Sequence, residues 1–424
     1  MERVARIPVD GSDQPPDVYL IEVGGMVGDI ESFVFLEALR QSRFRVGPER
    51  MCLVHLTLVP VMGSVGEQKT KPTQQTVRDL RSVGLSPDVI CCRSADMLEA
   101  STRSKMSAFC QVPESNVLTA YDVTNMYRVP LVLVKQGIHD IIHRQLKLGG
   151  SGGSGGFVSP PEMSRCEDLS NRVDDVTDPV RIAIMGKYTG LQDSCLSVIT
   201  ALKHSAVHAQ KAIDIVWVDA SDLESGDTKE WESLKSVDGV VIPGGFGAGV
   251  EGKILVSKWA TESGRPLLGV YMGFQCMIIE YCKTVLGWKE ANNTDFDETA
   301  GKPVVTLIPE SDKETMRLGL HKTILRPLKN GEPSITSDLY GGVSELTERQ
   351  RHRYEVNPGM IREMEEEGLE FVGRDATGKR MEIVELTRSA HPYFVGTQFH
   401  PEFLSRPLEP SPPFLGLTLA SSSQ

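Results

Sequence analysis

The chain has 424 residues, enough for two or three domains with buried cores, and 40% of them are apolar while 24% are charged. Its 57 acidic residues outnumber the 45 basic ones, giving a formal net charge of -12. This balance argues against binding to nucleic acid or to an anionic membrane surface through bulk charge. The N-terminus has no apolar signal segment, and no apolar run approaches the length of about 18 residues that spans a membrane. We therefore expect a cytoplasmic protein with reduced cysteines.

The first 148 residues alternate between short apolar runs and stretches with helical spacing. The runs at 18–23, 51–56 and 129–134 predict buried strands, because each is short and bounded by glycine, proline or polar residues. Apolar residues recur at helical spacing over 29–41 and 73–83. Such alternation is typical of a parallel α/β sheet.

Residues 149–156 (GGSGGSGG) form the sharpest break in composition, and they have no side chains with which to pack. They predict a flexible linker, followed by a connecting segment over 157–178. The sequence leaves open whether this linker is native or engineered.

Strand and helix signals resume after the connecting segment. Strands are predicted at 180–186, 213–218, 239–242 and 266–270, and helices at 194–209 and 253–262. We therefore expect an α/β fold with two doubly wound parallel-sheet domains, over 1–148 and 179–420.

Residues 268–275 (LGVYMGFQ) have the outline of a nucleophile elbow, a sharp turn from a strand into a helix. Gly269 and Gly273 allow the turn, and Tyr271 occupies the position of the nucleophile. Downstream, His400 is followed by Glu402, a pairing that serves as base and orienter for a nucleophile.

The elbow, the turn at 243–247 (PGGFG) and the triplet at 400–402 (HPE) resemble class I glutamine amidotransferases. Residues 24–32, 66–74, 316–319 and 351–357 are similar to motifs of the CTP synthase family, so the resemblance covers nearly the whole chain. It places Tyr271 on the nucleophilic cysteine, His400 on the base and Glu402 on its orienter.

The resemblance also implies a glutamine site that has changed in part. It assigns glutamine binding to Gly245, Gln275, Asp295 and Arg353, with the guanidinium of Arg353 suited to the α-carboxylate. Asp295 is one methylene shorter than the acidic residue of the family. The turn that supplies oxyanion-hole amides is also shorter here and lacks the family's arginine.

A phenol is a poor replacement for a thiol near neutral pH, because its ordinary pKa is about 10. We expect the Tyr271 ring to block the pocket, and His400 with Glu402 to persist as a structural pair. Cys276 lies inside the following helix and is not expected to act in place of the missing thiol.

In the first domain, the resemblance implies a binding segment for UTP or CTP at the starts of two helices. Its residues are Asp29, Ile30, Glu31, Lys69, Thr70, Lys71, Thr73 and Gln74. A helix start with lysines and hydroxyls suits a triphosphate, whereas acidic residues in a first turn also stabilise a helix without any ligand. Glu22 corresponds to a Mg²⁺ carboxylate of the family, and Mg²⁺ would accompany the nucleotide.

No ATP site is evident. The family's glycine-rich phosphate loop precedes the part that matches Met1, and the near-match at 247–253 continues into Ile254, which has no hydroxyl for Mg²⁺. The sequence therefore favours a degenerate relative that binds UTP or CTP, and possibly glutamine, and that forms a homo-oligomer or co-assembles with an intact CTP synthase. The alternative is a functional CTP synthase, which aminates UTP with ATP and glutamine, represented by an incomplete or engineered chain.

Overall fold

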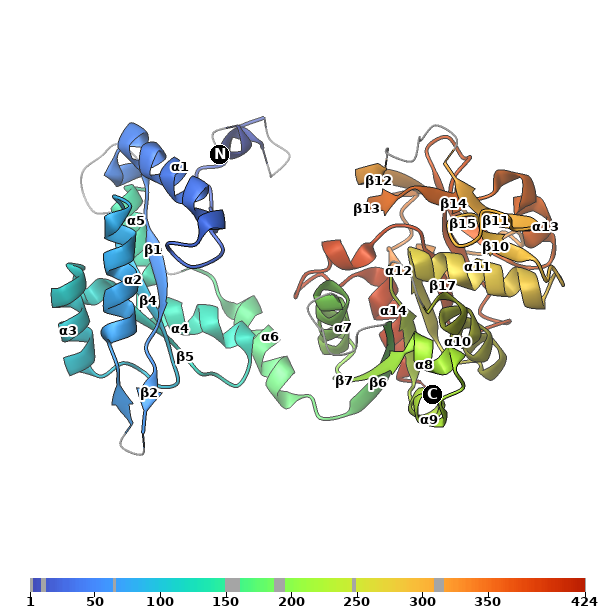
Figure 1. Cartoon of the computed structure of the whole chain (residues 1–424), viewed down its shortest axis with the longest axis horizontal. Helices are drawn as coiled ribbons and strands as arrows, with labels where there is room; N and C mark the ends of the chain where they lie inside the picture. The colour runs from blue at the N-terminus through green and yellow to red at the C-terminus, as the bar shows by residue number, and fades with distance from the viewer. Residues whose placement is uncertain are drawn as a thin grey trace. The chain divides into compact units, whose positions relative to one another are not determined.

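The computed structural model describes residues 3–8, 13–63, 66–148, 161–186, 195–245, 249–308 and 316–423. Contacts divide the chain into two compact units, Met1–Ser170 and Asn171–Gln424 (Figure 1). The predicted linker at 149–156 lies outside the described residues. Within the predicted connecting segment, α6 (Ser164–Asp175) begins in the first unit and ends in the second.

The first unit is built on a parallel sheet in the order β1-β4-β5. Its strands are β1 (Val54–Leu58), β4 (Val89–Ser94) and β5 (Val117–Tyr121). A short antiparallel pair, β2 (Val61–Met62) and β3 (Glu67–Gln68), follows β1. Further helices are α1 (Ile30–Val46), α2 (Lys71–Ser82), α3 (Ala100–Cys110), α4 (Val129–Lys135) and α5 (Ile138–Leu146).

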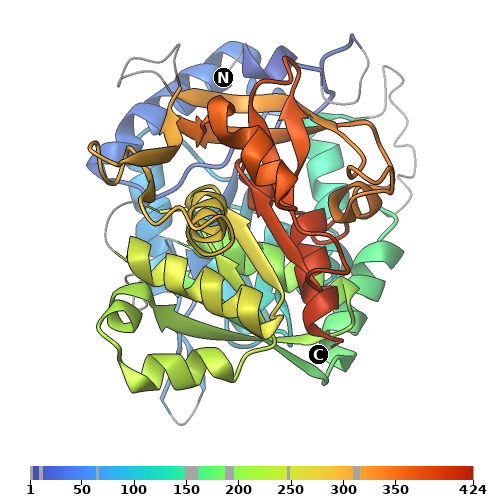
Figure 2. The ribbon, with the colours of Figure 1, turned by 90° about the vertical axis from the view of Figure 1, so that its right-hand side faces the viewer.

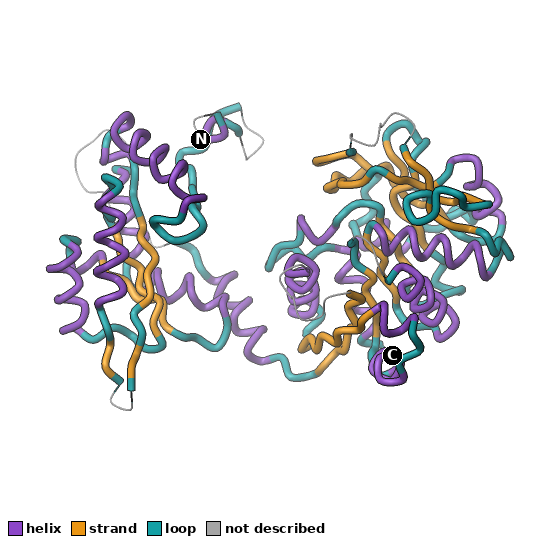
Figure 3. The backbone as a smooth tube through the Cα atoms, viewed as in Figure 1, coloured by secondary structure: helices purple, strands orange, loops and turns teal. Residues whose placement is uncertain are grey.

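Helices cover both faces of this sheet. Neighbouring residues of a strand point to opposite faces, so they pack against different helices. In β4, Ile90 packs in a core with Val77 of α2 and Met106 of α3. The preceding Val89 packs instead with Ile141 of α5. In Figure 3 the strands of each unit lie between helices.

Two strand predictions in this unit are wrong. Residues 18–23 have no regular secondary structure, and the run at 129–134 is helix α4. Pro130 stands at the start of that helix, where its fixed φ favours helical geometry and its missing N–H costs nothing. A short apolar run has no period that separates a buried helix from a strand.

The outer strand of the sheet has its apolar face exposed. In β1, Val54, Leu56 and Leu58 are exposed, Leu56 to 69%, while His55 and Thr57 between them are buried. His55 bonds Thr76 of α2 at 2.9 Å, so the polar face of the strand is the one that α2 covers.

The second unit contains a nine-stranded sheet in the order β13-β12-β15-β16-β17-β9-β8-β6-β7. The parallel part is β7 (Ala212–Asp219), β6 (Pro179–Gly186), β8 (Gly239–Ile242), β9 (Leu267–Val270) and β17 (Phe394–Thr397). The four strands predicted from sequence all belong to this part. An antiparallel extension, which was not predicted, adds β16 (Met381–Glu385), β15 (Glu370–Asp375), β12 (Arg317–Leu325) and β13 (Glu345–His352).

Helices lie on both sides of the parallel part (Figures 1 and 2). Ile182 and Ile184 of β6 share a core with α7 (Leu196–His208), α12 (Ile335–Leu339) and α14 (Pro412–Ser421). Ala183 and Met185 pack on the other side with α8 (Ala220–Glu224), α10 (Val250–Ser263) and α11 (Met272–Thr284). This doubly wound arrangement agrees with the predicted fold class.

The remaining helices and strands of this unit complete its described part. They are α9 (Thr228–Lys235), α13 (Ile361–Glu366) and a small sheet of β10 (Ala291–Asn293), β11 (Lys302–Leu307) and β14 (Tyr354–Val356). Among the described residues, no helix combines the length and apolarity that crossing a bilayer requires.

Candidate functional site

Tyr271 alone connects β9 to α11, and its backbone adopts φ 53° and ψ -101°. Such a φ is rare for a bulky residue and marks a strained turn. The Tyr271 N–H donates to the carbonyl of Thr397 at the end of β17 (2.7 Å), which fixes the turn against the sheet. A Cβ on Gly273 would lie 1.9 Å from the carbonyl oxygen of Ile242, so only glycine fits there. The geometry is that of a nucleophile elbow, as predicted.

His400 and Glu402 form a pair beside this turn. The Nδ1 atom of His400 donates to the Glu402 carboxylate at 2.8 Å. Since a carboxylate only accepts, Nδ1 carries the proton and Nε2 is the nitrogen that can take up another. The His400 ring lies 5.5 Å from the Tyr271 ring between centroids, and it stacks at 5.2 Å on Phe403. His400 and Glu402 therefore have the geometry of the histidine–carboxylate part of a triad, and the Tyr271 ring lies beside them.

The Tyr271 hydroxyl is held in its neutral form. Burial raises the pKa of Tyr271, and the nearby Asp295 carboxylate raises it further, against the opposing effect of Arg353. A neutral phenol is a weak nucleophile. Cys276 offers no substitute, because it is fully buried and burial raises the pKa of its thiol to about 12.

A cavity of about 630 Å³ opens in front of the elbow. Its wall combines the N-terminal end of α10, the start of α11 and the segment after β10; the lining residues are Glu224, Gly249, Val250, Glu251, Ile254, Tyr271, Met272, Gln275, Asn292, Asp295 and Phe296. The volume is in the range of small-molecule sites.

Two of the residues predicted to bind glutamine, Gln275 and Asp295, line this cavity. The Gln275 amide is already engaged, since it accepts from Asn293 Nδ2 at 2.9 Å and donates to the Tyr354 carbonyl at 3.5 Å. Asp295 accepts a hydrogen bond from the Tyr354 hydroxyl, which together with burial raises the pKa of that phenol.

Arg353 and Gly245 do not line the cavity. Arg353 is exposed in the turn between β13 and β14, close enough to Tyr271 to act on its pKa. Gly245 ends the described segment after β8, and residues 246–248, which include part of the near-match to a phosphate loop, lie outside the described residues. Lys253 of that near-match is buried in α10, where its amine contacts Met272 Sδ at 3.5 Å.

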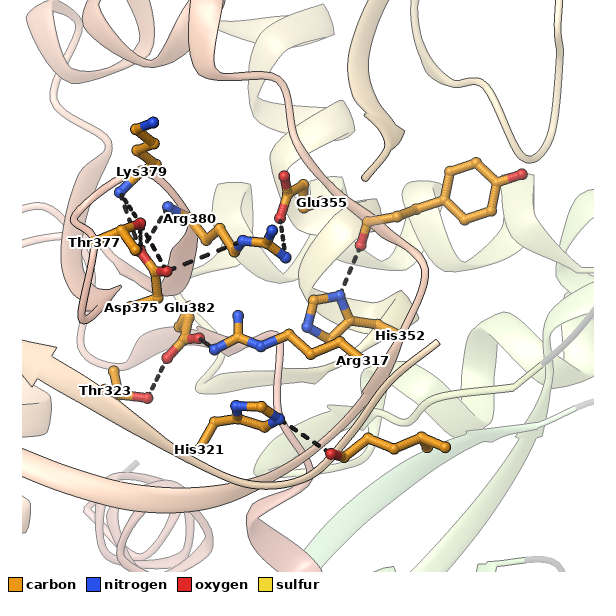
Figure 4. Close-up of polar contacts among 12 residues, drawn as sticks. Arg317, His321, Thr323, His352, Glu355, Asp375, Thr377, Lys379, Arg380 and Glu382 are labelled. Atoms are coloured by element: carbon orange, nitrogen blue, oxygen red, sulfur yellow. Dashed lines mark hydrogen bonds and ion pairs between the residues drawn. The ribbon is translucent and has the colours of Figure 1, made fainter. Parts of the chain in front are cut away.

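A network of charged side chains holds the turn that carries Arg353 (Figure 4). Glu355 faces Arg380 at 3.6 Å, and His352 Nδ1 donates to the Tyr354 carbonyl at 3.2 Å. Burial and the neighbouring Arg317 lower the pKa of His352 to about 3, so its ring is neutral.

The next layer of this network joins β12 to β16. Arg317 pairs with the buried Glu382 at 2.7 Å, and Thr323 also bonds that carboxylate. Sequence reasoning missed both layers. No signal in the sequence indicated them, because β13 is polar on both faces apart from Leu346, with Glu348, Gln350 and His352 on the buried side.

The predicted nucleotide segment in the first unit begins where α2 begins. Thr70 and Thr73 are buried; Thr73 accepts from Thr57 at 3.2 Å, and Gln74 donates to Thr70 Oγ1 at 3.1 Å. Lys69 and Lys71 are exposed, although Lys69 pairs with Glu67 at 2.6 Å. The two lysines are the members of the segment that are open to a ligand.

The second predicted nucleotide stretch begins α1. Asp29 precedes the helix and accepts from the Met26 N–H at 2.8 Å, which is a local structural contact. Ile30 is 95% exposed and Glu31 is also exposed. These residues lie together at a helix start, and among the described residues no hydrogen bond or ion pair joins them to Lys69 or Lys71.

Glu22 is exposed in an irregular segment, and the strand expected to end at it does not form. Within the described ranges, no three His, Cys, Asp or Glu side chains lie where they could hold a metal together. Mg²⁺ is usually held by one or two carboxylates together with phosphate oxygens, and Glu22 is a single exposed carboxylate of that kind.

Comparisons with known proteins match both units. The family model for the CTP synthase N-terminus matches residues 1–148, and the model for class-I glutamine amidotransferases matches residues 191–419. A CTP synthase from Dictyostelium discoideum is 48% identical over 442 residues, which covers 99% of this chain and 77% of that protein. Human CTP synthase 1 is 46% identical over 433 residues, with 99% and 71% covered.

A solved structure resembles the second unit. The glutaminase domain of a Trypanosoma brucei CTP synthase, with bound acivicin, is 33% identical to the chain in the superposed part and gives a TM-score of 0.54. The superposition covers 58% of this chain and 94% of that domain.

Proposed function

Because the chain belongs to the CTP synthase family of pyrimidine biosynthesis, we propose that it is a catalytically silent member that binds UTP or CTP and associates with an intact CTP synthase to modulate it. The observation that carries the proposal is Tyr271. It occupies the strained position of the nucleophile, next to a correctly formed His400–Glu402 pair, and its phenol is kept neutral by burial. A pocket that retains its base but has no thiol can bind glutamine or a related ligand without hydrolysing it.

Nucleotide binding is proposed for the first unit. Lys69 and Lys71 are exposed at the start of α2, where ammonium groups and the helix N-terminus both favour a triphosphate. Mg²⁺ would enter with the phosphates, which supply most of its oxygen ligands, and Glu22 would contribute one carboxylate.

Association with an intact relative is supported by the apolar surface of the first unit. Val54, Leu56 and Leu58 of β1 are exposed. In α1, Ile30, Phe33, Val34 and Phe44 are exposed as well. An edge strand with apolar side chains pairs readily with another chain. A homo-oligomer would use the same surface, in the cytoplasm where we place the protein.

The experiment mixes the purified chain with an intact CTP synthase at cellular concentrations, with and without UTP and CTP. We expect the two to co-elute on size exclusion and the rate of CTP formation to change with added chain. Leu56→Lys should abolish both effects, whereas Lys135→Ala, an exposed change at the end of α4, should preserve them. Separate elution with an unchanged rate contradicts the proposal.

A second candidate is a working CTP synthase whose remaining parts come from a longer form of the chain or from a partner. The intact His400–Glu402 geometry and the 48% identity to CTP synthases fit this candidate too. A transcript that extends through a glycine-rich lysine loop, and encodes cysteine at position 271, would establish it.

A further inference from the structure

Two buried carboxyl groups belong to segments that meet next to His400. Glu402 is 7% exposed in the short helix Pro401–Leu404, and Glu348 is 4% exposed in β13. One oxygen of each is satisfied: Glu402 Oε1 accepts from His400 at 2.8 Å, and Glu348 Oε1 accepts from the Tyr340 hydroxyl at 2.7 Å.

The backbone brings these two carboxyls together. The His400 N–H donates to the carbonyl of Arg349, the residue after Glu348, at 2.9 Å, and β13 packs against the helix that carries Glu402. The Glu402 charge is also close enough to contribute to the raised pKa of Glu348. The two segments that carry the carboxyls are therefore neighbours, and the two groups are close enough to interact electrostatically.

The second oxygen of each group has no partner in the part of the chain that the structure describes. Glu348 Oε2 and Glu402 Oε2 are both buried and make no hydrogen bond. Two ionised carboxylates at one buried position would repel each other, and neither could donate. A single proton converts one of the two oxygens into a donor, so that both are satisfied by one short, charge-assisted bond.

The location of the proton follows from the other partners. Glu402 accepts from the imidazole Nδ1–H of His400, so it already serves as an acceptor toward that ring. Burial raises the pKa of Glu348 to about 8. The neighbouring Glu402 charge also raises this pKa, whereas the hydrogen bond from the Tyr340 hydroxyl lowers it. Across β12, His321 is the register partner of Glu348, and its Nε2 is engaged with the Leu318 carbonyl at 3.1 Å.

We infer that Glu348 is protonated at neutral pH and donates a hydrogen bond to Glu402 Oε2, forming a buried chain Tyr340–Glu348–Glu402–His400. Glu348 is then a positioning residue: it fixes the orientation of the Glu402 carboxylate, and through it the ring of His400. This series of hydrogen bonds explains how the His400–Glu402 pair keeps its geometry, whatever residue occupies position 271.

Infrared difference spectroscopy of the unaltered chain across pH 5–10 tests the inference without requiring catalysis. We expect a protonated-carboxyl band that titrates near pH 8 and is absent in Glu348→Gln. In Glu402→Gln the titration midpoint of Glu348 should move to lower pH, because the neighbouring charge is gone. Glu385→Gln, which alters another buried carboxyl on β16, should leave this midpoint unchanged.

Two results would overturn the inference: the absence of any band that Glu348→Gln removes, or an unchanged midpoint in Glu402→Gln. Far-ultraviolet circular dichroism checks that each variant is folded. If Glu348→Gln does not fold, the midpoint measured in Glu402→Gln decides alone, since it compares two chains that both retain Glu348.

Discussion

The aromatic ring of Tyr271 lies 5.5 Å from the imidazole of His400, at an interplanar angle of 38°. The two residues follow neighbouring parallel strands, one between β9 and α11 and the other after β17. His400 and the residue at the turn of the elbow are thus neighbours, and burial raises the pKa of that phenol. Because a neutral phenol is a weak nucleophile, we propose that the pocket at the elbow binds a ligand without hydrolysing it.

The elbow depends on Gly273, because any Cβ there would collide with the backbone of β8. We predict that Gly273→Ala lowers the free energy of unfolding by at least about 1–3 kcal/mol, the usual cost of overpacking. Gly186→Ala is the control, since its Cβ would meet no described atom within 4 Å. Urea denaturation of both variants measures the difference, and equal midpoints would show that the turn can relax.

The buried carboxyl of Glu348 predicts a pH dependence of stability. Its folded pKa is raised from 4.5 to about 8, so its contribution to stability is fully present below about pH 4.5 and is lost as the pH rises through about 8. The wild type should therefore lose stability relative to Glu348→Gln over this window. Glu345→Gln, an exposed change in the same strand, should run parallel to the wild type in thermal denaturation at each pH. A constant difference for Glu348→Gln would contradict the prediction.

Arg317 balances the charge of Glu382, whose side chain is only 1% exposed. Arg317→Met should lower the free energy of unfolding by about 3–5 kcal/mol, because it leaves a buried charge without its partner. Arg388→Met breaks an exposed pair with Asp338 and should cost less than about 1 kcal/mol. Chemical denaturation distinguishes the two, and similar losses would mean that Glu382 is neutral in the folded chain.

Nucleotide binding should depend on the two exposed lysines at the start of α2. We predict that Lys69→Ala and Lys71→Ala each weaken UTP or CTP binding by about 1.5–3 kcal/mol, the typical worth of a charged hydrogen bond. Binding should also weaken as salt increases. Lys135→Ala is the matched control for charge. If calorimetry gives the same affinity for the unaltered protein and for all three variants, the nucleotide does not bind at the start of α2.

The sequence predicted the parallel core and the elbow because both have strong local signals. A glycine on either side of Tyr271 specifies a sharp turn, and the apolar runs at β6, β8 and β9 are bounded by breakers. The run at 129–134 was misassigned because its apolar residues have no distinguishing period and Pro130 decides the outcome. The antiparallel extension could not be predicted, since its strands carry buried carboxyl groups such as Glu348 and Glu382, whose partners meet them only after folding. The resemblance assigned Arg353 to glutamine binding, but it gave no role to Arg380 and Glu355, which pair beside the turn that carries Arg353.

The measurement that tests the central claim most directly is glutamate release from glutamine by the purified chain, beside a Tyr271→Cys variant and a Tyr271→Phe control, with ammonia detected independently. Our account predicts no release above a heat-inactivated control for the unaltered chain or for Tyr271→Phe, and release by Tyr271→Cys, in which His400 and Glu402 again have a thiol to activate. Turnover by the unaltered chain would contradict the account and would identify an enzyme with another nucleophile.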